Sequence, residues 1–149
     1  MEKCREIILN CDLNQVGLLV DRLDDALAEI HRLAQEEDIR SYVFLVAIIE
    51  YCKIHRKEAV PELLHMAAFI TLIFFNYMEG MIPLSYQHQK EAILLAPENE
   101  EYKKVFMNMY IEHPDVDHDK EFEKWVMLVN ILPLSVNHLF SIAISIYLF

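Results

Sequence analysis

The chain has 149 residues, of which 54% are hydrophobic, and its formal net charge is -11 at pH 7. This length suits one ordinary domain with a substantial core, and the hydrophobic content excludes an intrinsically disordered chain. Acidic surfaces repel nucleic acid and anionic membranes, so the charge argues against both as partners and suits a basic protein.

Helical periodicity runs through almost the whole sequence. Only two glycines occur, and no hairpin signal such as Asn-Gly or Asp-Gly interrupts the apolar stripes, which predicts an all-α fold. We expect seven or eight helices joined by short turns, at about residues 2–10, 13–33, 40–55, 61–79, 83–95, 100–112, 119–132 and 135–149. Because segment 40–55 is apolar nearly all round, it is predicted to be a central, buried helix.

One stretch has the punctuation of a helix–turn–helix repeat. Gly80 is placed to end a first helix, Ala92 to fill a tight helix–helix contact, and Pro97 to close the unit, while Phe69 takes the large apolar position of the first helix. This segment resembles a tetratricopeptide repeat, and a more degenerate unit follows it. The resemblance implies stacked antiparallel hairpins in a compact bundle: a single domain, 1–149, with N-terminal helices in 1–60 and repeat-like hairpins in 61–149.

Chemistry-bearing motifs are sparse. No nucleophile elbow, phosphate-binding loop or dinucleotide-binding loop is present, so the chain is predicted not to be an enzyme and to need no cofactor. The turn at 113–119, HPDVDHD, is an alternative metal site, but it departs from a calcium loop because Lys120 and Val126 occupy its glycine and glutamate positions. A helix-capping role explains these acids as well, so no metal is expected.

Cysteines and termini predict a cytoplasmic location. Three cysteines are too few and too poorly spaced for a disulfide framework, so reduced, buried thiols are expected. The N-terminus lacks the layout of a signal peptide. The apolar stretch 131–149 is interrupted by Pro133 and several polar residues, so we interpret it as a buried helix; the alternatives are a membrane anchor or a contact between two copies of the chain.

Acidic residues gather in the last third of the sequence, with tyrosines nearby. This distribution is explained either by a solvated face or by a partner-binding surface, in which carboxylates attract a basic protein and aromatic side chains anchor it. The candidate partner-binding residues are Tyr77, Glu98, Glu101, Tyr102, Asp115, Asp117 and Asp119.

Small size, acidity, a degenerate repeat and the absence of a catalytic motif together resemble the α-helical immunity proteins of bacterial toxin systems, including contact-dependent growth inhibition. The resemblance is carried by AFITLIFFNYMEG, HQKEAILLAPENEEYKKVFMNMY and DKEFEKW. It implies a cytoplasmic protein that binds and occludes a cognate toxin domain, with a basic nuclease as the toxin that best matches the charge. The alternative is a general repeat adaptor that binds a peptide or helix in a groove.

Overall fold

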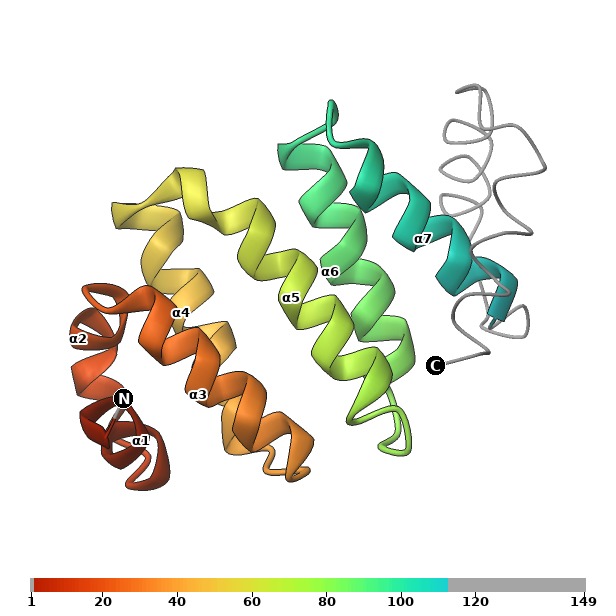
Figure 1. Ribbon diagram of the computed structural model, residues 1–149. Helices are drawn as coiled ribbons and strands as arrows, with labels where there is room; N and C mark the ends of the chain where they lie inside the picture. Colours follow the sequence, from red (N-terminus) through yellow and green to blue (C-terminus); the bar gives the residue numbers. More distant parts are fainter. Residues whose placement is uncertain (1, 113–149) are drawn as a thin grey trace. The chain divides into compact units, whose positions relative to one another are not determined.

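The computed structural model describes residues 2–112, and in that range every regular element is helical. Figure 1 shows its seven α-helices, which confirm the predicted all-α fold class. They are α1 (Glu2–Leu9), α2 (Val16–Val20), α3 (Leu23–Gln35), α4 (Arg40–His55), α5 (Val60–Ile73), α6 (Met81–Leu95) and α7 (Glu100–Glu112), with short 3-10 helices at Leu13–Gln15 and Lys57–Ala59. The helices expected at 119–132 and 135–149 lie outside the described residues.

The chain divides into two compact units, and the division follows α6. The first unit is Met1–Glu98, which contains α1 to α6, and the second begins at Asn99 and contains α7. The prediction of one domain, 1–149, with a border near residue 60 between N-terminal helices and repeat-like hairpins, stays a prediction.

Within the first unit, the helices form two layers. In the view of Figure 1, α3 and α5 lie in front, and α4 and α6 pass behind them. Side-chain contacts agree with this arrangement, because His31 of α3 stacks on Phe69 of α5 and Tyr42 of α4 contacts His88 of α6. Since successive helices are antiparallel, α3 and α5 run in the same direction.

The turn between α5 and α6 is longer than the sequence predicts. α5 ends at Ile73 and not near Glu79, and Gly80 directly precedes α6 instead of stopping α5. Gly80 has φ of 83°, in the left-handed region that favours glycine, and its carbonyl accepts a hydrogen bond from the amide of Leu84. Phe75, inside this turn, is fully buried. α5 is therefore shorter than predicted, and the turn that replaces its last residues buries the side chain of Phe75.

The helix predicted over 13–33 is broken in the structure. α2 and α3 are separated at Asp21 and Arg22, and Arg22 has the non-helical φ and ψ of -127° and 48°. The break lets both helices pack on α4 with their own buried stripes. It also frees the carbonyl of Val20, which accepts a hydrogen bond of 3.1 Å from Arg56 Nη1 at the end of α4.

α4 is the central helix of the first unit, but it is not buried all round. Its inner side holds six buried residues, among them Phe44, which is fully buried. Its outer side exposes apolar side chains, because Val43 is 46% and Ile54 is 74% exposed. The prediction of an all-round buried helix is therefore wrong for this outer side.

All three cysteines are free, but their surroundings differ. Cys4 and Cys52 are buried, as predicted, and burial raises the pKa of the Cys52 thiol. Cys11 is exposed in the turn after α1, where its φ is 54°, so the prediction of a buried thiol is wrong at this position. The turn places its side chain off the buried face of α1.

Two arginine–carboxylate pairs hold α1 and the turn before α4. Glu29 is buried on α3, where Arg32 Nη2 lies 2.6 Å and Arg5 Nε of α1 lies 3.7 Å from its Oε1. The hydrogen bonds from Arg32 hold the pKa of Glu29 below its ordinary value of 4.5. In the same way, Arg40 lowers the pKa of Asp38, while Arg40 Nη1 donates 2.8 Å to the carbonyl of Leu9.

These lowered pKa values predict a loss of stability in acid. A carboxylate with a lowered folded-state pKa stabilises the fold above its unfolded pKa, and the contribution disappears as the pH falls through the folded value. We expect Glu29→Gln to lower the free energy of unfolding by about 1 kcal/mol at pH 7. This difference should shrink below pH 4.5, the ordinary value for Glu29.

Denaturant titrations between pH 7 and pH 3 measure the effect. Glu37→Gln is the matched control, because Glu37 is exposed in the same region. Equal losses for the two variants, or a difference that grows in acid, would contradict the assigned role of Glu29.

Candidate functional site

The face shared by α3 and α5 carries an aromatic contact between two helices. The rings of His31 and Phe69 are stacked with centroids 6.4 Å apart, and Phe74 meets both edge-on, at 5.7 Å from His31 and 6.0 Å from Phe69. Gln35 Nε2 lies 3.2 Å from His31 Nε2, so the amide of the next helical turn holds the imidazole. We call His31, Phe69 and Phe74 the aromatic cluster. Its three rings pack against one another.

Apolar side chains at this end of the face remain open to solvent. Phe69 is 45% exposed, Ile73 is 50% exposed, and Tyr77 in the following turn is 63% exposed. The large apolar position of a repeat helix predicts that Phe69 lies in the core. In the structure its side chain is instead nearly half exposed. Single exposed apolar residues are ordinary, but Phe69 and Ile73 lie one helical turn apart on the same side of α5, and exposed apolar side chains grouped in this way are typical of a protein-binding surface.

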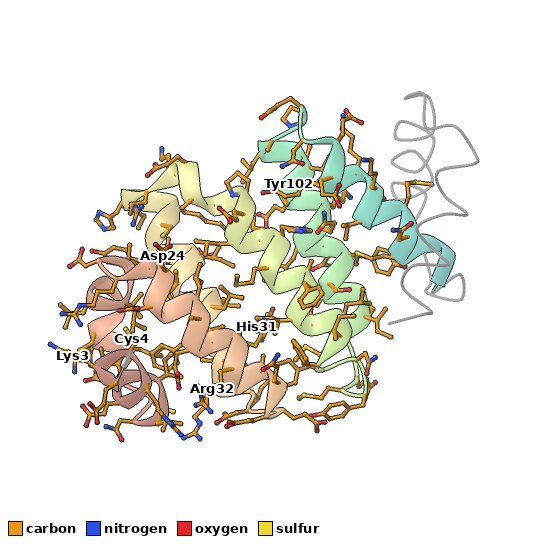
Figure 2. All side chains as sticks on the ribbon, viewed as in Figure 1. Lys3, Cys4, Asp24, His31, Arg32 and Tyr102 are labelled. Carbon is orange, nitrogen blue, oxygen red and sulfur yellow. The ribbon has the colours of Figure 1, made fainter. Side chains whose placement is uncertain are left out.

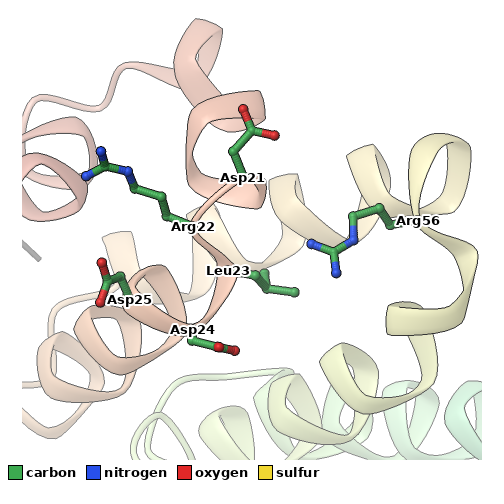
Figure 3. Close-up of a pocket in the computed structure, with 6 residues that line it drawn as sticks. All are labelled: Asp21, Arg22, Leu23, Asp24, Asp25 and Arg56. Carbon is green, nitrogen blue, oxygen red and sulfur yellow. The ribbon is translucent and has the colours of Figure 1, made fainter.

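A polar hollow lies elsewhere in the first unit, beside the link between α2 and α3. It has a volume of about 410 Å³, and Figure 3 shows Arg56 reaching toward the link from the end of α4. Its lining residues are Asp21, Arg22, Leu23, Asp24, Asp25 and Arg56. Arg56 Nη1 donates a hydrogen bond to the Val20 carbonyl, and Arg56 Nε lies 3.6 Å from Glu58 Oε1. These contacts give the guanidinium a structural role in joining the end of α4 to the end of α2.

The other layer holds a neutral hydrogen-bonded pair. Tyr42 Oη lies 2.7 Å from His88 Nε2, within hydrogen-bonding distance. Burial raises the pKa of Tyr42 to about 12 and lowers the pKa of His88, so both groups are neutral at pH 7. The pair ties α4 to α6 and has the chemistry of a structural contact.

The predicted site residues fall in different places. Tyr77 is exposed in the α5–α6 turn, and Glu98 is exposed at the end of the first unit. In α7, Glu101 is exposed and lies 3.8 Å from Lys104, whereas Tyr102 is only 9% exposed. The remaining three predicted residues, Asp115, Asp117 and Asp119, lie outside the described residues.

In residues 2–112, no three His, Cys, Asp or Glu side chains come together as a metal would require. No helix in that range is long and apolar enough to cross a bilayer. The two segments that raised these alternatives, 113–119 and 131–149, lie beyond it.

Sequence reasoning missed the aromatic cluster. His31 belongs to a helix whose neighbours suggested a solvated face, and Phe69 fitted an inward repeat position. The available signal was the four-residue spacing of Phe69 and Ile73, since two large apolar residues one turn apart share a side of a helix. That pattern could not reveal whether the shared side faces the core or solvent.

The fold and the face define an all-helical protein with an open apolar surface. Comparison with protein-family models, with curated proteins and with solved structures finds no match to the chain. The functional assignment therefore depends on the surface itself.

Proposed function

We propose that this chain is a non-catalytic protein-binding scaffold whose α3–α5 face docks a basic partner domain and occludes it. The observation that carries the proposal is the pair of exposed apolar side chains on one side of α5, Phe69 and Ile73, beside His31, with the exposed Tyr77 in the following turn. Buried aromatic anchors supply most of the affinity in protein interfaces, and a surrounding acidic surface accelerates association with a basic partner.

An immunity protein that neutralises a nuclease-type toxin combines these properties. The net charge of -11 supports a basic partner, and nuclease domains present basic surfaces to nucleic acid. In this proposal Tyr77 is an anchor. Glu98, Glu101, Asp115, Asp117 and Asp119 steer the approach of the partner, since exposed charges act mainly on the association rate.

Shortening the apolar group should weaken partner binding without unfolding the chain. We expect Phe69→Ala combined with Ile73→Ala to raise the dissociation constant about 30-fold, because anchors at the centre of an interface contribute about 2 kcal/mol or more. The matched control is Val43→Ala with Ile54→Ala, which shortens two exposed apolar residues on the outer side of α4.

The measurement is affinity capture from the source cell in low and moderate salt, followed by titration of the captured protein. A single basic domain that the control retains and the Phe69/Ile73 variant loses supports the proposal. Equal retention by both variants contradicts the assigned face, and capture of several unrelated proteins points to the adaptor function.

A further inference from the structure

Two parallel helices on the α3–α5 face repeat the same spacing. Along α3, the side chains at spacings i, i+4, i+7 and i+11 are Asp24, Ala28, His31 and Gln35. The corresponding row along α5 is Glu62, Met66, Phe69 and Ile73. Residues at these spacings share one side of a helix, and the His31–Phe69 contact aligns the two rows.

The chemistry of the rows changes from one end to the other. The first members, Asp24 and Glu62, are exposed carboxylates in the first turns of their helices. At the other end, the row of α5 is apolar with Phe69 and Ile73 beside Phe74, whereas the row of α3 ends in the polar Gln35. Figure 2 shows the change along α3, with Asp24 near its start and His31 on the side toward α5.

The acidic end keeps its charge available. Carboxylates are favoured at helix N-termini, which accounts for their positions, but among the described residues neither Asp24 nor Glu62 forms an ion pair. Arg22 and Arg56 line the same hollow as Asp24, and Arg56 is held by the Val20 carbonyl and by Glu58. Both exposed carboxylates can therefore still form an ion pair with a cationic group of a partner.

The middle of the face permits close approach. Ala28 is exposed and small, so a partner backbone can lie against α3 at this level. Met66 on α5 is half-buried, and methionine side chains adapt to irregular surfaces. The face thus has apolar anchor residues at one end, small or adaptable side chains in the middle and carboxylates at the other end.

We propose that the α3–α5 face binds one amphipathic segment of the partner, apolar at one end and basic at the other, with the two ends about 17 Å apart. The spacing follows from the separation of eleven positions from Asp24 to Gln35, at about 1.5 Å per helical residue. A partner helix would span this distance in about three turns, and an extended segment in about five residues. This inference rests on the proposed function, because it specifies what the same face recognises.

Synthetic helical peptides test the spacing with the full-length chain. Each peptide carries one Phe-Leu pair and one Lys-Lys pair on the same helical side. The first residues of the two pairs are 4, 11 or 18 positions apart, with alanine and glutamine at all other positions and a constant total length. We expect the peptide with a separation of 11 to bind about tenfold tighter than the other two in fluorescence anisotropy, because it alone reaches both ends. Equal affinities for the three peptides, or no binding by any, overturn the proposal.

Charge reversal locates the basic end of the peptide. The double variant Asp24→Lys with Glu62→Lys should lower the affinity for the peptide with a separation of 11 about tenfold. It should also bind the three peptides with equal affinity. The control, Glu2→Lys with Glu6→Lys, makes the same change in net charge on α1, and should change the affinity by less than about threefold. Equal losses in both variants would show general electrostatic attraction and contradict the assigned orientation.

The outcomes separate this inference from the proposed function. Suppose that capture of a cellular partner depends on Phe69 and Ile73, but the three peptides bind equally well. That result supports the docking face and refutes the proposal of a single amphipathic segment. Spacing-dependent peptides without any basic cellular partner establish the segment chemistry and refute the occlusion of a basic domain.

Discussion

Replacing Phe44 with alanine is expected to lower the free energy of unfolding by about 3–5 kcal/mol, the range for a large core aromatic. Phe44 is fully buried on α4, which packs against α2, α3 and α5. The lost side chain leaves a cavity among several helices at once, so neighbouring residues have little freedom to fill it. Because domains are commonly stable by about 5–15 kcal/mol, the variant should be close to unfolding at body temperature.

Val43→Ala is the control for this substitution. Val43 is the adjacent residue on α4, but it is 46% exposed, so its shortening should change the free energy of unfolding by less than about 1 kcal/mol. Urea titrations followed by circular dichroism give both values. Similar losses for the two variants would mean that the outer side of α4 is covered in solution.

Local signals were sufficient where a helix has clear ends. The predicted helices over 40–55 and 100–112 agree with α4 and α7 in the structure. For α7, the turn before the helix supplies a cap, because the side-chain oxygen of Asn99 accepts hydrogen bonds from the amides of Glu101 and Tyr102. Residues with such local roles can be placed from sequence because their partners are only a few positions away.

Sequence alone did not predict the two interruptions, because both depend on distant partners. The α5–α6 turn exists so that Phe75 can enter the core, although the sequence around it has ordinary helical character. The break at Arg22 is supported by Arg56, which binds the carbonyl of Val20 from another helix. Helical periodicity describes one stripe at a time and contains no information on these long-range contacts.

The candidate site shows the same division between local and distant information. The exposure of Tyr77 could be anticipated, because it lies next to the glycine turn. The aromatic cluster could not, because it joins His31 to Phe69 and Phe74 across two helices. His31 and Phe69 form one surface only because α3 packs beside α5, and neither residue indicates this contact in the sequence.

The main core aromatic and the proposed binding face lie in different layers. The layer of α4 and α6 contains the fully buried Phe44 and the half-buried Tyr42–His88 pair, which hold the helices together. The layer of α3 and α5 carries the aromatic cluster on its open face. Substitutions at Phe69 and Ile73 should therefore change binding with little effect on unfolding, whereas substitutions at Phe44 should do the reverse.

Enlarging Ala92 should destabilise the chain by closing the space between α5 and α6. Ala92 is fully buried on the same side of α6 as Gln89, whose Oε1 lies 2.9 Å from His65 Nδ1 of α5, so this side faces α5. We expect Ala92→Leu to lower the free energy of unfolding by about 1–3 kcal/mol, because added methylenes in a packed interface force helices or rotamers apart.

Ala28→Leu makes the same chemical change on the exposed side of α3, and should alter the free energy of unfolding by no more than about 0.5 kcal/mol. Thermal unfolding of both variants measures the contrast. A stable Ala92→Leu variant would mean that α5 and α6 can separate without cost. In that case the tight contact at Ala92 would not define the hairpin, and Gly80 and the buried Phe75 would remain as its determinants.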